Sequence, residues 1–84
     1  MLISQALNEK INEQIGYEFA ASIQYTAIAA HFDAESLPFL ARHFYKQAEE
    51  EHMHAMKFIQ FLIDAGARVE IPTIAKPVSR FPFA

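Results

Sequence analysis

The sequence predicts an all-α protein: an antiparallel hairpin of two long helices, followed by an extended C-terminal tail. Two segments carry apolar residues at alternating spacings of three and four, the pattern of a helix with one packed face. A short polar stretch at 33–36 separates them, and three prolines after residue 68 end the helical pattern. We therefore expect one domain over residues 1–84, with helices at about 4–32 and 36–65 and a tail at 68–84.

The first helix is expected to begin after Ser4, whose hydroxyl suits a capping position, and to continue to about Phe32. Gly16 lies inside this helix at a cost of about 1 kcal/mol relative to alanine. We interpret it as tolerated, rather than as a sign that a neighbouring helix comes close. The predicted packed face consists of Leu7, Ile11, Ile15, Glu18, Ser22, Tyr25, Ala29 and Phe32.

The second helix is expected after a turn at 33–36, with Ser36 as its cap and Pro38 in its first turn, where proline loses no hydrogen bond. Gly66 suits the left-handed position that follows a helix. The predicted packed face of this helix consists of Leu40, Phe44, Gln47, Glu51, His54, Phe58, Phe61 and Ala65.

The tail alternates apolar residues with prolines and is expected to be extended. Its apolar side chains are too numerous to lie in solvent, so we expect them against the outside of the helices or across a subunit boundary. These residues are Val69, Ile71, Ile74, Phe81 and Phe83.

Two ionisable groups interrupt the second packed face, and one interrupts the first. Glu51 and His54 lie one helical turn apart, and Glu18 and Glu51 are each about 15 residues from the turn, or roughly 22 Å along their helices. A buried carboxylate is costly unless it is paired, and a metal ion is a partner that Glu and His can share. The alternative is a hydrogen-bonded polar cluster that fixes the register of the two helices.

The apolar content exceeds what a two-helix hairpin can bury. Of the 84 residues, 52% are hydrophobic and 13% are aromatic, whereas two helices share only one face. We therefore expect a homodimer or a higher homo-oligomer, in which two hairpins complete a four-helix bundle.

Charge and composition exclude several classes of function. The net charge is -3, and the basic residues are scattered, so the pattern gives no sign of nucleic-acid binding. The chain has no cysteine, hence neither disulfides nor thiolate metal sites. No signal-peptide pattern and no apolar run of about 20 residues occurs, so we expect no membrane partner and a cytoplasmic location.

Two segments resemble the ferritin and bacterioferritin family. They read NEQIGYEFAAS at 12–22, with Tyr25 beyond it, and AEEEHMHAMK at 48–57. The resemblance extends from about residue 7 to residue 77, which corresponds to the first two helices of a ferritin subunit and the start of its long crossover. It implies a half-ferritin fold, because the third, fourth and fifth helices have no counterpart.

The resemblance also implies a di-iron centre that catalyses oxidation of Fe(II) by dioxygen, in iron storage or detoxification. Glu18 corresponds to the family's single glutamate, and Glu51 with His54 corresponds to its Glu-x-x-His element, with Glu51 bridging the two irons. Tyr25 matches a tyrosine beside the centre, although a core aromatic is an equal interpretation. Two copies of the chain would supply four carboxylates and two imidazoles, which is a complete ligand set.

Several alternatives stay open at this point. Glu50 is either a solvated charge or a group that assists metal access. Mn(II) or Zn(II) could take the place of iron, whereas we expect no haem, because His52 follows Glu51 where the haem-binding branch has methionine. The alternative function is a truncated or split ferritin half that acts as a non-enzymatic helical assembly or metal-binding module.

Overall fold

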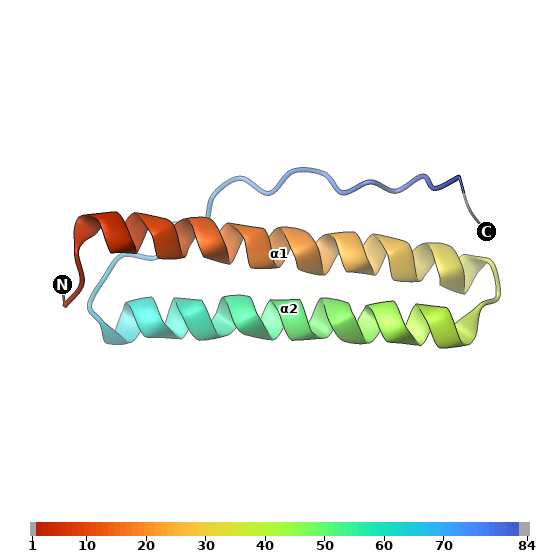
Figure 1. Cartoon of the computed structure of the whole chain (residues 1–84), viewed down its shortest axis with the longest axis horizontal. Helices are drawn as coiled ribbons and strands as arrows, with labels where there is room; N and C mark the ends of the chain where they lie inside the picture. Colours follow the sequence, from red (N-terminus) through yellow and green to blue (C-terminus); the bar gives the residue numbers. More distant parts are fainter. Residues whose placement is uncertain (1, 83–84) are drawn as a thin grey trace.

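A computed structural model describes residues 2–82 and shows an all-α hairpin (Figure 1). Helix α1 spans Gln5–Ala34 and α2 spans Pro38–Asp64, and the two pack antiparallel along their whole length. From residue 67 to residue 82 the chain is extended. Neither helix in this described range combines the length and the apolar composition that a membrane crossing requires.

The hairpin is thin and elongated. Its dimensions are 49 × 20 × 11 Å, and its radius of gyration is 15.5 Å. A compact domain of this length has a radius of gyration of about 12 Å. The fold therefore forms a single helical layer, and one broad side of each helix has no second layer packed against it.

The helix ends follow local chemistry, with one correction. The Ser4 hydroxyl accepts a hydrogen bond from the Leu7 amide at 3.1 Å, as predicted, and Gly66 has a φ of 66° just after α2. The prediction that Ser36 caps α2 is wrong, because the cap residue is Leu37, which makes no side-chain cap bond. Ser36 instead has a φ of 58° and closes the turn through its amide, which donates to the Asp33 carbonyl at 3.1 Å.

The helix interface matches the predicted packed faces only in part. Buried as predicted are Ile15, Ala29, Phe32 and Ala65. In α2 the buried residues recur every seven positions and are mostly small, namely Ala41, Ala48, Ala55 and Leu62. The Ser22 hydroxyl of α1 donates to the Ala48 carbonyl at 2.8 Å, a contact that only a close helix approach permits. Other large residues predicted to be buried flank this stripe instead, and Leu7, Leu40 and Phe61 are 45%, 44% and 48% exposed.

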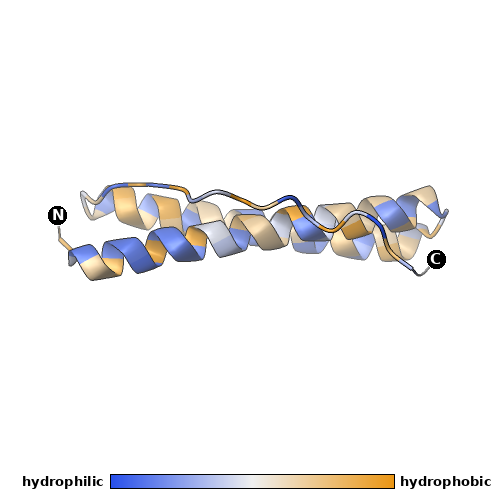
Figure 2. Cartoon of the chain, turned by 90° about the horizontal axis from the view of Figure 1, so that it is seen from above, coloured by the Kyte–Doolittle hydropathy of each residue, from blue (hydrophilic) through white to orange (hydrophobic). Residues whose placement is uncertain are grey.

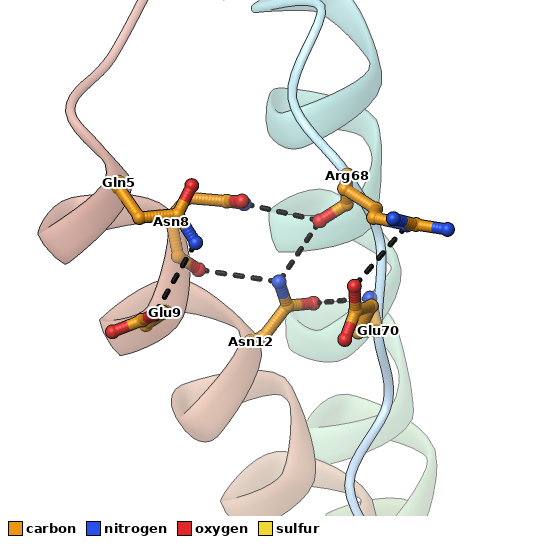
Figure 3. Close-up of polar contacts among 6 residues, drawn as sticks. All are labelled: Gln5, Asn8, Glu9, Asn12, Arg68 and Glu70. Carbon is orange, nitrogen blue, oxygen red and sulfur yellow. Dashed lines mark hydrogen bonds and ion pairs between the residues drawn. The ribbon is translucent and has the colours of Figure 1, made fainter.

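Polar side chains of α1 hold the start of the extended tail (Figure 3). The side-chain amides of Asn8 and Asn12 both donate to the Arg68 backbone carbonyl, at 3.0 and 2.9 Å. The Asn12 side-chain oxygen accepts from the Glu70 amide at 2.7 Å. Both asparagines are buried, so the backbone of the tail supplies the partners that their side chains require.

Farther along, the tail runs back beside α1, on the side away from α2 (Figure 1), and Figure 2 shows it following the length of the hairpin. The Gln24 side chain accepts from the Val78 amide and donates to the Val78 carbonyl, each at 2.9 Å. The ring of Phe81 lies 5.2 Å from that of His31. The tail thus packs on the outside of the helices, although Ile71 remains 50% exposed in the single chain. Phe83, also predicted to pack there, lies outside the described residues.

Gly16 has a packing role rather than a merely tolerated one, which corrects the sequence-based interpretation. A Cβ atom at this position would collide with the side chain of Pro72. A proline ring cannot swing aside, because it is bonded to the backbone at both ends. The close neighbour is therefore the tail, and Gly16 provides the notch in which Pro72 lies.

We expect Gly16→Ala to destabilise the protein by about 1–3 kcal/mol, because the overpacking cost exceeds the gain in helix propensity of about 1 kcal/mol. Thermal or urea denaturation followed by circular dichroism measures the difference. In a Pro72→Ala background, which removes the colliding atoms, the same substitution should become stabilising. Equal effects in both backgrounds would contradict the notch.

Candidate metal centre

Three potential ligands from two helices converge at the middle of the hairpin. Glu18 comes from α1, and Glu51 and His54 come from successive turns of α2. One ligand atom from each lies within 4.8 Å of the others. His54 Nδ1 is 3.5 Å from a Glu18 oxygen and 3.7 Å from a Glu51 oxygen. Within residues 2–82, no other group of at least three His, Cys, Asp or Glu side chains lies close enough to share one ion.

The site is open on one side. The side chains of Glu18 and Glu51 are 14% and 22% exposed, whereas that of His54 is 51% exposed. The expectation that His54 points into a buried helix interface is therefore wrong for the single chain. The alanine stripe fills that interface, so the ligand cluster lies at its edge and faces the uncovered side of the hairpin.

Glu18 and Glu51 can form a hydrogen bond between their carboxyl groups when one of the two carries a proton. This bond raises the pKa of Glu51 above its ordinary value of 4.5, and burial and the charge of Glu18 raise it further. The same bond lowers the pKa of Glu18, against an opposing effect of burial. When the pair holds one proton, Glu51 therefore carries it and the Glu18 carboxylate accepts the hydrogen bond. A cation placed between them would remove the need for the shared proton.

The donor set suits a divalent metal ion of intermediate hardness. Two carboxylates and one imidazole match the preferences of Fe(II), Mn(II) and Zn(II), and the open side leaves room for further ligands. The Glu18 carboxylate is also held on its own helix, because Gln14 Nε2 donates to its Oε1 at 3.1 Å. Sequence reasoning did not select Gln14, although its position one turn before Glu18 was a usable signal.

The other predicted site residues lie around the cluster rather than in it. Tyr25 is seven residues beyond Glu18, about 10 Å along α1, with its ring 6.0 Å from that of Phe44. Glu50 is exposed and outside the cluster, but its charge contributes to raising the pKa of Glu51. Gln47 is half-buried one turn before Glu51.

An apolar hollow lies on the side chains that flank the helix interface, toward the open end of the hairpin. Its volume is about 410 Å³. It is lined by Leu7, Ile11, Lys57, Phe58 and Phe61. Ile11 lies seven residues before Glu18, and Phe58 and Phe61 lie four and seven residues after His54. These spacings keep one helix face, so the hollow lies on the same side of the hairpin as the ligand cluster.

Known proteins resemble this chain over most of its length. It is 56% identical over 64 residues to the bacterioferritin BfrB of Mycobacterium tuberculosis, which covers 76% of this chain and 35% of that protein. It is 36% identical over 76 residues to a bacterial non-heme ferritin of Staphylococcus aureus, covering 90% of this chain and 46% of that protein. The chain thus spans between about a third and a half of the length of these relatives.

Comparison with solved structures also finds ferritins. An open-pore ferritin from the hyperthermophilic archaeon Archaeoglobus fulgidus superposes with a TM-score of 0.91 at 32% identity, covering 96% of this chain and 49% of that one. The family model for the ferritin-like domain matches residues 8–84. That range contains both helices almost entirely, all three clustered ligands and the tail, so this chain belongs to the ferritin family.

Proposed function

We propose that this chain binds Fe(II) through Glu18, Glu51 and His54 and oxidises it with dioxygen at a di-iron centre shared by two copies. The observation that carries the proposal is the convergence of three ligand atoms from two helices within 4.8 Å. The names of its relatives support it, because they are ferritins and bacterioferritins. A role in iron storage or detoxification in the cytoplasm completes the proposal.

Fe(II) and dioxygen are the substrates in this reaction. Two Fe(II) ions lose one electron each, and dioxygen takes up both electrons with two protons to give hydrogen peroxide and two Fe(III) ions. The carboxylates of Glu18 and Glu51 favour the ferric product, because each added positive charge strengthens its attraction to fixed negative ligands. Zn(II) suits the same ligands but has no redox chemistry, so it should inhibit. Mn(II) is a further substitute.

A second copy would complete the centre. One chain offers two carboxylates and one imidazole, and a two-fold axis beside the cluster would double this to four and two. The uncovered side also carries the apolar hollow and large side chains that remain 44–48% exposed, such as Leu40 and Phe61. Burial of such a surface is the usual driving force for association. The proposed partner is therefore the chain itself, as a homodimer or a larger homo-oligomer.

The direct test is a dioxygen-uptake assay with anaerobically prepared Fe(II). The proposal requires consumption of one dioxygen for every two Fe(II), above the rate of spontaneous oxidation, and inhibition by Zn(II). Binding of Fe(II) without accelerated dioxygen uptake would leave the competing function, a metal-binding helical module without enzymatic activity. The observation that favours this alternative is the exposure of His54, which leaves one side of the cluster open in the single chain.

Metal affinity should rise with pH, because the metal must displace the proton that Glu51 shares with Glu18. The raised pKa of Glu51 extends this dependence above the ordinary value of 4.5. We expect up to about tenfold tighter Co(II) binding per pH unit below that pKa, and a plateau above it. Calorimetric titration of Co(II) at a series of pH values measures the dependence.

The Glu50→Gln variant provides the control. The negative charge of Glu50 contributes to raising the pKa of Glu51, so its removal should move the whole affinity curve to lower pH without abolishing binding. An affinity curve that lies at the same pH in Glu50→Gln as in the wild type would contradict the contribution of Glu50 to the raised pKa of Glu51.

A further inference from the structure

We infer that Gln14 is a positioning residue for the metal centre: it holds one oxygen of Glu18 so that the other is presented to the metal. The inference deepens the proposed function and rests on it. Gln14 lies one helical turn before Glu18 on the same side of α1, and its Nε2 donates to Glu18 Oε1 at 3.1 Å.

The two oxygens of Glu18 have different surroundings. Oε1 accepts from Gln14, whereas Oε2 is the atom that lies 3.5 Å from His54 Nδ1. A glutamate side chain has three rotatable bonds, and without a contact at Oε1 its carboxylate could turn away from His54. The hydrogen bond from Gln14 therefore fixes which oxygen faces the ligand cluster.

A neutral donor suits this position better than a charged one. An ammonium or guanidinium group would neutralise Glu18 and repel an incoming cation, and a second carboxylate at this position would repel Glu18. The glutamine amide orients the carboxylate and leaves its charge available to the metal. Gln14 is also half-buried, so water competes less for the Glu18 oxygen than at a fully exposed pair.

The chain contains a matched pair for comparison. Gln60 Nε2 donates to Asp64 Oδ1 at 2.8 Å, with the same spacing of four residues, but on an exposed part of α2 away from the cluster. Methionine replaces glutamine with similar length and helix propensity and removes the side-chain amide, including the donor to the carboxylate. The variants Gln14→Met and Gln60→Met thus differ in whether the lost hydrogen bond acts on a ligand.

The test is Co(II) titration of the full chain, followed by the visible absorption of the bound metal. We expect Gln14→Met to bind Co(II) about tenfold more weakly than the wild type, and Gln60→Met to bind within about twofold of it. In a Glu18→Ala background, Gln14→Met should cause no further loss, because its effect passes through Glu18. An equal loss in both backgrounds, or no loss in the wild-type background, would overturn the inference.

A metal-free measurement separates this inference from the proposed function. In the nuclear magnetic resonance spectrum, one side-chain amide proton of Gln14 should be shifted downfield and should lose this shift in Glu18→Ala. Absence of the Glu18-dependent shift would overturn the positioning role and leave the proposed function intact. Failure of the wild type to bind Co(II) would contradict the proposed function, and the positioning role with it.

Discussion

Replacement of Glu51 by alanine is expected to abolish the acceleration of Fe(II) oxidation by dioxygen, with a rate loss on the order of 100-fold or more. Outer-shell partners of metal ligands already contribute about 10–100-fold, and Glu51 would be a ligand itself. Glu51 also lies beside both other groups of the cluster, since its oxygen is 3.7 Å from His54 Nδ1 and the Glu18 carboxyl group raises its pKa. Stopped-flow absorbance of the ferric product measures the rate.

The neighbouring glutamates provide matched controls for this prediction. Glu49→Ala and Glu50→Ala remove the same charge from the same turn of α2, but both residues are exposed and outside the ligand cluster. We expect their rates to stay within about threefold of the wild type, in line with weak exposed charge interactions. Circular dichroism should show unchanged helicity in all three variants. Wild-type rates in Glu51→Ala would contradict the assigned centre.

Replacement of Phe61 by lysine is expected to dissociate the proposed dimer. Phe61 lines the apolar hollow and is 48% exposed in the single chain, so a partner would bury the remainder. Truncating or charging a central aromatic anchor costs about 2–4 kcal/mol, which weakens association by roughly 30- to 1,000-fold. Sedimentation velocity measures the oligomeric state, and the variant should also lose Fe(II) oxidation, because its centre would be incomplete.

Ile63→Lys is the control for this surface. Ile63 is 55% exposed, but it lies two residues from Phe61 and hence on the other side of α2. Its replacement should leave the dimer intact. Dissociation by Ile63→Lys but not by Phe61→Lys would place the interface on the opposite side of the hairpin and contradict the shared centre.

The ligand cluster could be predicted from the sequence because helix geometry brings its three residues to one level of the hairpin. Glu51 and His54 lie one helical turn apart, and Glu18 lies at the same distance as Glu51 from the turn of the hairpin. Together with the resemblance to ferritins, this arithmetic was enough to name three residues that the structure brings within 4.8 Å.

The packing of the helices could not be predicted in the same way. On α1, hydrophobic periodicity correctly selected Ile15 and Phe32. On α2 it selected mostly large side chains, whereas the interface uses Ala41, Ala48 and Ala55, because small residues let two backbones approach closely. The position of the tail could not be predicted from periodicity either. Its position depends on Asn12, which binds the backbone near Arg68 and Glu70, and on the notch at Gly16, and neither leaves a periodic signal.

The shared di-iron centre is tested most directly by native mass spectrometry of the protein after anaerobic loading with Fe(II). A single spectrum reports both the number of chains and the number of metal ions in each assembly. The proposed centre predicts two irons for every two chains, and their loss in Glu51→Ala. Metal-free monomers, or dimers that hold a single iron, would contradict it.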